Sequence, residues 1–358
     1  MSRTAGTVSL AGHRVETWRV WVFAVCTLAL IGVAVGYGAY SAHGHSATSA
    51  SPAGAGADAV KTLPLSVSGA PRVLYVDTKI GPDQGRLAEA SPADPGASPE
   101  LGAPECQRSY SAGGTLVCLS LAGSVLTTSL HVQVYDSAAP TARPERSLTL
   151  TGTPSRARVS ADGKLVAWTV FVSGDSYNGP NFSTRTGILN VRTGALVENL
   201  ETFNAYVNGR LYRSVDINYW GVTFASDDNT FYATMGSKGK TWLMRGDLAT
   251  HTLTSVVENA ECPSLSPDGT RVVFKKRVDT SLAAPWRFYV LDLATGQEKP
   301  LAETRSVDDQ AAWLDDDTVM YAVPHTDGTG YDIWEVPADG TGKPSLLIRD
   351  GSSPSVIE

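Results

Sequence analysis

The chain has 358 residues, 42% of them hydrophobic and 18% charged, which suits one large packed domain with appendages. Its 29 Lys and Arg against 36 Asp and Glu give a formal net charge of −7. Phosphate backbones are bound by clustered cations, and the sequence has no basic stripe. We therefore expect no nucleic-acid partner.

The first element is an uncharged apolar run over residues 20–40, long enough for one helix to cross a bilayer. Arg14 and Arg19 precede it, and the next Lys or Arg is Lys61. This asymmetry predicts a cytoplasmic tail over residues 1–19 and a transmembrane helix or uncleaved signal anchor over residues 20–40. Everything after the helix is then expected outside a bacterial cytoplasmic membrane, in a single-pass arrangement.

The alternative is a cleaved secretory signal. Ala39 and Ser41 place small residues where a signal peptidase reads them, so cleavage after Ser41 would release the domain. The run is long for a signal peptide, which favours the retained anchor. In either case residues 41–70, rich in Ala, Gly, Ser and Pro, predict a flexible linker. We interpret His43 and His45 in this linker as solvated rather than metal-binding.

A repeated pattern fills the rest of the chain: a short strand, a turn rich in Asp and Gly, and a second, apolar strand. It recurs at residues 107–121, 156–170, 221–235, 262–276 and 310–324. The turn centres are 49, 66, 40 and 48 residues apart, and most of these steps fit a unit of four strands. Four antiparallel strands form one blade of a β-propeller.

The turn at residues 266–269, Ser-Pro-Asp-Gly, explains the pattern chemically, because Asp bonds neighbouring backbone and Gly accepts a positive φ. A β-branched and aromatic strand, Arg271–Phe274, follows. At the C-terminal end, residues 351–358 look like the inner strand of a blade whose other three strands are missing. Residues 71–79 look like the second strand of a blade whose first strand is missing. Joined, they predict a sixth blade, which makes residues 71–358 a closed, all-β, six-bladed propeller of four-stranded antiparallel blades.

The run Ser-Pro-Asp-Gly-Thr-Arg-Val-Val-Phe at residues 266–274, followed by Tyr-Val-Leu-Asp-Leu-Ala-Thr-Gly at 289–296, resembles the repeat of TolB-like (WD40-like) β-propeller proteins. The resemblance covers nearly all of the presumed exterior part. It implies a bacterial envelope protein that docks other proteins. A predicted membrane helix and linker stand here where TolB has a separate N-terminal globular domain, so no particular partner is carried over.

Two of the four cysteines are expected to form a disulfide. Cys106 and Cys118 flank the turn at residues 112–114 almost symmetrically, which predicts that they lie opposite each other on adjacent antiparallel strands, within bridging distance. An oxidising compartment favours the bond. Cys26 falls in the apolar run, and Cys262 is expected to be a buried free thiol on an inner strand.

Catalytic signatures are sparse. No Gly-x-Ser-x-Gly elbow occurs, which argues against the serine peptidases that carry similar propellers. His131, His251 and His325 are scattered over three predicted blades, and a shared metal site would need clustered ligands. Residues 315–317, three aspartates, occupy a hairpin turn, where turn chemistry explains them better than Ca²⁺. We therefore predict no catalytic residue, metal or cofactor.

The longest step between turns indicates insertions at residues 173–186 and 201–219. The second insertion and the residue after it combine aromatic and Arg side chains, the composition of binding hot spots. The candidate partner-binding residues are Tyr206, Arg210, Tyr212, Arg213, Tyr219 and Trp220. The alternative is that this insertion folds back and caps its own blade.

Two function classes remain open. The first is a non-enzymatic protein-binding or scaffolding propeller on the outer face of a bacterial cytoplasmic membrane, with an unidentified envelope or membrane protein as partner. The second is an extracytoplasmic enzyme that acts on a glycan or peptide at the propeller's central face.

Overall fold

The computed structural model describes residues 8–10, 13–15 and 71–357, except 95–99, 125–126, 138–142, 173–182 and 282. The chain divides into two compact units, Met1–Asp58 and Ala59–Glu358. In the first, β1 (Val8–Leu10) pairs antiparallel with β2 (His13–Val15). The predicted transmembrane helix over 20–40 and linker over 41–70 lie outside the described residues. Within the described part of the chain, no helix has the length and apolar character to span a bilayer.

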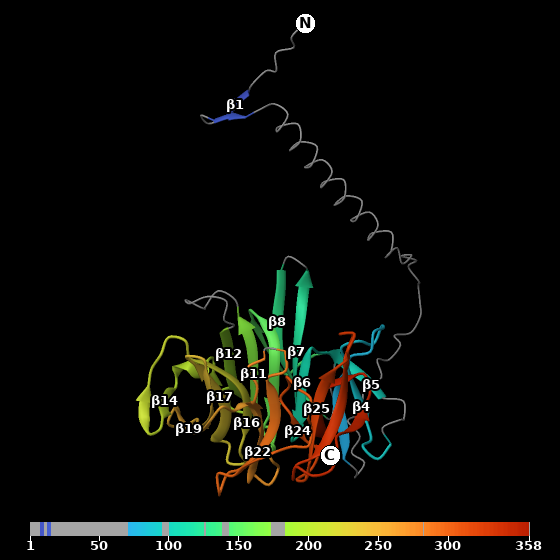
Figure 1. Ribbon diagram of the computed structural model, residues 1–358. Helices are drawn as coiled ribbons and strands as arrows, with labels where there is room; N and C mark the ends of the chain where they lie inside the picture. The colour runs from blue at the N-terminus through green and yellow to red at the C-terminus, as the bar shows by residue number, and fades with distance from the viewer. Residues whose placement is uncertain are drawn as a thin grey trace, which may run out of the picture. The chain divides into compact units, whose positions relative to one another are not determined.

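The second unit consists of six sheets, which we number as blades from the N-terminal end (Figure 1). Blade 1 contains β28 (Gly351–Ile357), β3 (Arg72–Asp77), β4 (Arg86–Ala90) and β5 (Glu100–Glu105). Blade 2 contains β6 (Arg108–Ala112), β7 (Thr115–Ser124), β8 (Thr127–Asp136) and β9 (Arg146–Leu150). Blade 3 contains β10 (Thr153–Val159), β11 (Leu165–Val172), β12 (Ser183–Asn190) and β13 (Leu196–Val197).

Blade 4 is built on β16 (Asn218–Phe224), β17 (Thr230–Ser237), β18 (Lys240–Asp247) and β19 (Thr252–Glu258). Blade 5 contains β20 (Glu261–Leu265), β21 (Arg271–Arg277), β22 (Trp286–Asp292) and β23 (Glu298–Pro300). Blade 6 contains β24 (Ala312–Trp313), β25 (Thr318–Pro324), β26 (Tyr331–Pro337) and β27 (Ser345–Ile348). The predicted all-β, six-bladed architecture is confirmed.

The turn between β20 and β21 forms as its sequence predicts. The Asp268 carboxylate accepts hydrogen bonds from the Ser266 hydroxyl at 2.5 Å and the Thr270 N–H at 3.0 Å. Gly269 has a φ of +70°, which a residue without a Cβ adopts at no steric cost. Local side-chain bonds of this kind fix the hairpin register, and the apolar residues of β21 therefore face the core.

The two chain ends close the ring as predicted. β28 pairs antiparallel with β3 from Gly351 opposite Asp77 to Ile357 opposite Arg72. A β-bulge interrupts this pairing between Ser352 and Ser355. β28 is the inner strand of blade 1, so this pairing covers the inner edge of β3.

Aromatic rings pack over glycines between neighbouring strands. Gly246 stands opposite Phe231, and a Cβ built on it would lie 2.1 Å from the ring. Gly187 stands opposite Trp168 in the same way, with 2.5 Å to its ring. The missing Cβ therefore makes room for a buried ring, which explains glycines inside strands, where they otherwise weaken a sheet.

The predicted disulfide between Cys106 and Cys118 is confirmed, with 5.5 Å between the Cα atoms. The geometric reason differs from the expected one. Arg108 pairs with Leu119, so Cys106 lies before β6, in the connection from blade 1, and is not part of the hairpin. The bond therefore joins two blades. Cys262 is a buried free thiol on β20, as predicted.

The insertion expected as a loop over residues 201–219 contains two added strands, and this part of the prediction is wrong. A 3-10 turn, η1 (Leu200–Thr202), leads into β14 (Asn204–Val207), which turns back as β15 (Arg210–Tyr212). β14 pairs parallel with β19, so the sheet of blade 4 has six strands. Within this insertion, Phe203 and Ala205 are buried in the core of blade 4.

Candidate functional site

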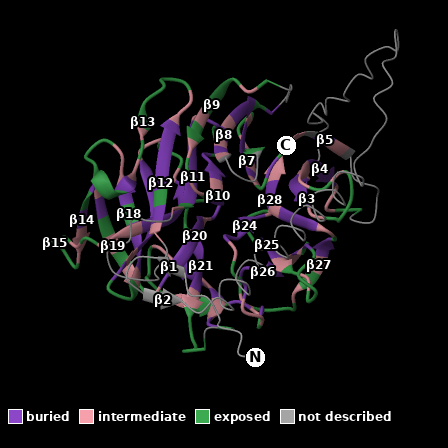
Figure 2. Cartoon of the chain, turned by 90° about the horizontal axis from the view of Figure 1, so that it is seen from above, coloured by how far each residue is buried: buried purple, intermediate pink, exposed green. Residues whose placement is uncertain are grey.

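The inner strands of the six blades meet around the centre of the ring, seen from above in Figure 2. Charged side chains gather at the end where β6 begins. The β7–β8 hairpin extends past this end, because Arg108 pairs with Leu119 while β7 continues to Ser124 (Figure 1). We call the charged group the central cluster; it consists of Arg108, Arg156, Arg158, Glu261, Lys275 and Asp308.

Two arginines of the central cluster tie opposite blades together. Arg158, on β10, is 5% exposed and donates from Nη2 to the Ala311 carbonyl of blade 6 at 3.0 Å. Its guanidinium lies 4.3 Å from the centroid of the Tyr110 ring. Arg156 reaches the Asp308 carboxylate at 3.4 Å. Side chains therefore fill the centre of the propeller.

Lys275 is the most completely buried cation of the central cluster. Its side chain is 2% exposed, and its ammonium lies 2.5 Å from Asp308 Oδ1. The same ammonium stands 4.3 Å from the Trp286 ring centroid, a cation–π distance. Trp286 donates from Nε1 to the buried carboxylate of Glu261 at 3.0 Å. Each charge on this side of the cluster thus has a partner.

Burial and neighbouring charges set the electrostatics here. Burial, reinforced by repulsion from Arg156, lowers the pKa of Arg108. Burial acts to raise the pKa of Asp308, but attraction to Lys275 and Arg156 outweighs it and holds that pKa below its ordinary value. The carboxylate of Asp308 therefore stays ionised, while Arg108 and Arg156 remain close enough to repel each other.

A cavity of about 20 Å³ lies among the inner strands of blades 1, 2, 3 and 6. Its charged lining consists of Arg108, Arg156, Arg158 and Asp309, three cations and one anion. Guanidinium groups bind carboxylates and phosphates with paired hydrogen bonds. The chemistry of this lining therefore favours an anionic group.

The predicted partner-binding residues divide into an exposed and a buried set. Arg210 and Arg213 are exposed and Tyr206 is partly exposed, all on or beside the β14–β15 hairpin. Tyr219 and Trp220 instead belong to β16 and are 1% and 9% exposed. Both side chains are buried, so in this structure they are not accessible to an external binding partner.

Tyr212 holds the β14–β15 hairpin to blade 4. Its hydroxyl lies 3.0 Å from the Ser237 hydroxyl, and its ring centroid lies 5.8 Å from that of Trp242. Phe203 is buried in the same core, 6.2 Å from Phe231. Phe203 and Tyr212 therefore cap blade 4, which is the alternative that the sequence left open beside partner binding.

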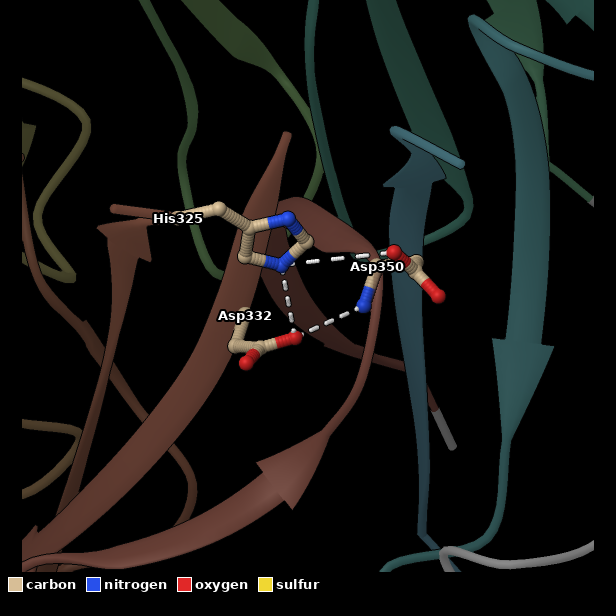
Figure 3. A group of neighbouring side chains, drawn as sticks. All are labelled: His325, Asp332 and Asp350. Carbon is tan, nitrogen blue, oxygen red and sulfur yellow. Dashed lines mark hydrogen bonds and ion pairs between the residues drawn. The ribbon is translucent and has the colours of Figure 1, made fainter. Parts of the chain in front are cut away.

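A second polar group joins blade 6 to blade 1 (Figure 3). His325 Nε2 lies 3.0 Å from Asp332 Oδ1 and 4.0 Å from Asp350 Oδ1. Their ligand atoms lie within 4.8 Å of one another, a spacing that a metal ion would accept. Asp332 Oδ1 also accepts the Asp350 N–H at 3.0 Å. Hydrogen bonds account for the group, which we interpret as a link between the blades.

The remaining histidines and the aspartate run stand apart from the central cluster. His131 contacts the Thr149 hydroxyl at 3.3 Å in blade 2, and His251 stacks on Phe203 with 4.6 Å between ring centroids. Residues 315–317 lie in the β24–β25 turn, where Asp315 accepts the Asp317 N–H at 2.8 Å. Turn chemistry explains the run, as predicted.

Sequence reasoning missed the central cluster. Its members come from β6, β10, β20, β21 and the segment before β24, so spacing along the chain does not reveal that they meet. One signal was available: Arg156 and Arg158 alternate with Ala157 within an inner strand, where a packed propeller calls for small or apolar residues. Charges at such positions indicate a polar centre.

Comparison with known proteins supports the fold. No protein-family model and no curated protein matches the chain. TolB from Acinetobacter baumannii superposes with a TM-score of 0.57 at 16% identity, over 80% of this chain and 66% of that one. A chain of a nidogen/laminin complex gives a TM-score of 0.50 at 9% identity, over 80% and 98%.

The protein is thus a six-bladed β-propeller, as its repeat predicted, and its fold is similar to that of TolB. It spans just under two thirds of the length of the Acinetobacter baumannii TolB chain. Because these identities are low, the likeness establishes the fold and leaves function to the sites.

Proposed function

We propose that this chain is a non-enzymatic protein-binding propeller, held at the outer face of a bacterial cytoplasmic membrane by residues 20–40. The observation that carries the proposal is the β14–β15 hairpin, an addition to the four-stranded blade that exposes both cationic and apolar side chains. Its partner is an envelope or membrane protein.

The hairpin and the segment after it have the composition of a binding surface. Leu211 is 49% and Val215 86% exposed, and Val215 is the most exposed large apolar residue among those that the structure describes. Arg210 and Arg213 flank Leu211. Exposed apolar side chains bordered by Arg are enriched where proteins bind each other.

Hydrogen bonds hold the base of this surface to blade 4. Asp216 accepts hydrogen bonds from the Ser214 hydroxyl at 2.5 Å, the Ser237 hydroxyl at 2.6 Å and the Lys238 N–H at 2.7 Å. The Ser214 hydroxyl, followed by the other two donors, lowers the pKa of Asp216 to about 2. A segment ordered before it binds loses less conformational entropy on association.

The test compares crosslinked partners on intact cells. Arg210→Glu with Arg213→Glu reverses the charge of the hairpin, and Arg192→Glu with Lys343→Glu makes the same charge change at exposed positions of blades 3 and 6. We expect the wild type and the control pair to recover the same protein, and the hairpin pair to lose it. Equal recovery by all three proteins would remove the hairpin from the proposal, and enrichment of no protein over the tag alone would remove protein binding.

Two further measurements address the rest of the proposal. Protease added to intact spheroplasts is expected to degrade the propeller, because it lies outside the membrane; protection would place it inside. Turnover of a glycan or peptide panel by the purified chain would instead favour the enzyme alternative, which acts at the propeller's central face.

A further inference from the structure

Three buried side-chain donors at the centre of the propeller have no acceptor among the residues that the structure describes. They are Nε of Arg156, Nε of Arg158 and the hydroxyl of Ser109. All three residues line the same cavity of about 20 Å³. A buried donor left without an acceptor costs free energy, so three of them around one space point to a group that accepts hydrogen bonds.

The charge of the cavity lining specifies that group further. Three arginines face one carboxylate, that of Asp309, whose Oδ2 already accepts the Ala322 N–H at 3.0 Å. Asp308, which does not line the cavity, is shared between two cations, since its Oδ1 lies 2.5 Å from the Lys275 ammonium and 3.4 Å from Nη2 of Arg156. The lining thus keeps an excess of positive charge although the whole chain carries −7. An anion bound here would gain both the donors and the charge.

The volume limits what can enter. A space of about 20 Å³ holds roughly one water-sized group and cannot enclose a whole metabolite. Only the tip of a larger ligand fits, with the rest of the ligand remaining outside the cavity. A planar carboxylate at the end of a side chain or peptide is thinner than a tetrahedral phosphate, and it matches the planar arginine fork.

We propose that the cavity of the central cluster binds a peptide carboxylate, presented as an acidic side chain or a chain terminus. Arg156 and Arg158 donate to its oxygens through Nε, and Ser109 donates its hydroxyl. The inference rests on the proposed function in one respect, because both take the ligand to be part of a protein. It does not involve the β14–β15 hairpin.

The experiment measures binding of short peptides to the full chain by fluorescence anisotropy with a neutral fluorophore. One peptide is amidated and ends in Glu, the second is identical but ends in Gln, and the third ends in Ser with a free carboxylate. We expect the Glu or the free-terminus peptide to bind about tenfold or more tightly than the Gln peptide, the ratio expected for charge-assisted hydrogen bonds. Whichever acidic peptide binds more tightly identifies the source of the carboxylate.

Variants connect this binding to the cavity. Arg156→Met and Arg158→Met should each lower the affinity for the acidic peptide about tenfold. Arg158→Lys keeps the charge but loses the Nε donor, so binding should fall between Arg158→Met and wild type. Arg192→Met, which replaces an exposed arginine of the β12–β13 turn, should change nothing. Thermal unfolding of each variant shows whether the fold survives, and Ser109→Ala provides a milder change if an Arg variant unfolds.

Several results would overturn the inference. Equal affinity for the Glu, Gln and free-terminus peptides would do so, as would unchanged affinity in folded Arg156→Met and Arg158→Met. Tighter binding of inorganic phosphate or sulfate than of either acidic peptide would show a site for tetrahedral anions instead. These outcomes are independent of the crosslinking test: peptide binding without a captured partner leaves this inference standing, and a hairpin-dependent partner without peptide binding leaves the proposed function standing.

Discussion

Blade 4 and blade 1 are stabilised in different ways. Blade 4 comes from one continuous stretch, and its core holds large side chains such as Phe231, Met235 and Met244, all fully buried. Blade 1 combines both ends of the propeller sequence, and smaller residues such as Val73 and Ala88 are prominent in its core. Blade 4 is therefore stabilised mainly by buried apolar area, while blade 1 has less of it to offset the entropy of bringing distant segments together.

Additional bonds connect blade 1 to both neighbours. Toward blade 2, the Cys106–Cys118 disulfide crosses the joint. Toward blade 6, the Thr78 N–H donates to the Asp350 carbonyl at 2.7 Å, and the Tyr331 N–H donates to the Thr78 hydroxyl at 3.0 Å. The comparison indicates that blade 1 depends on the disulfide and on hydrogen bonds to its neighbours, whereas blade 4 depends on apolar packing.

The strongest test of this difference is removal of the closing strand. Deletion of Gly351–Glu358 leaves β3 without its inner neighbour and exposes Tyr75, which is 3% exposed in the intact ring. The lost pairing and burial rival the whole net stability of a domain, about 5–15 kcal/mol, so we expect no cooperative urea transition. Deletion of Glu358 alone is the control. A truncated chain that unfolds cooperatively near the wild-type midpoint would show that blade 1 does not need its C-terminal strand.

The second test addresses the packing of blade 4. Phe231→Ala empties the space over Gly246 and should lower the free energy of unfolding by about 3–5 kcal/mol in urea titrations. Phe171→Ala is the matched control, because that ring is 40% exposed, and its loss should cost about 0.5 kcal/mol or less. If the two substitutions cost the same, burial of the Phe231 ring is not what stabilises blade 4.

The fold could be predicted because its signals are local. Asp and Gly at the hairpin turns, as at residues 266–269, repeat at the spacing of the blades. The sequence around Arg72–Asp77 has no preceding strand to pair with as a first strand, and β28 at the other end of the chain takes that position. The disulfide was also predictable, although its geometry was not. Cys106 lies outside the hairpin because the register is set by the turn at Gly113 and Gly114, which sequence symmetry placed slightly too early.

The site was less predictable because it depends on where the blades meet. The strand at Asn204–Val207 pairs parallel with β19, which follows it in the sequence, and the strand at Arg210–Tyr212 pairs antiparallel with Asn204–Val207. Composition alone gave no sign of the parallel pairing. The central cluster likewise joins residues as distant as Arg108 and Asp308, which only the closed ring brings together. Both features require three-dimensional packing between repeats.

The third test removes the covalent joint of blade 1. Replacing Cys106 and Cys118 together with Ser frees the connection between blades 1 and 2, and we expect a loss of about 2–4 kcal/mol in the free energy of unfolding. Reductant should lower the wild-type stability toward that of the double variant and leave the variant unchanged. A variant as stable as the oxidised wild type would mean that the joint holds without its covalent bond.

The last and smallest effect concerns His325, at the joint of blade 1 with blade 6. A hydrogen bond to Asp332, followed by the charges of Asp332, Asp350 and Asp327, raises the pKa of His325 above its ordinary value, although Arg305 and Arg349 line the same cavity. A raised pKa in the folded state means that the stabilisation is complete below the unfolded value of about 6.5 and disappears as the pH rises through the folded pKa.

His325→Gln should therefore lower the free energy of unfolding by about 0.5–1 kcal/mol near pH 5.5, the range of partly exposed ion pairs, and by almost nothing at pH 9. His131→Gln is the matched control, because that ring contacts the hydroxyl of Thr149 and no carboxylate in the described chain. Urea titrations of both variants at the two pH values measure the difference. A pH-independent loss in His325→Gln would mean that the imidazole contributes by packing, and that the charge of the acidic group does not hold the closing blade to its neighbour.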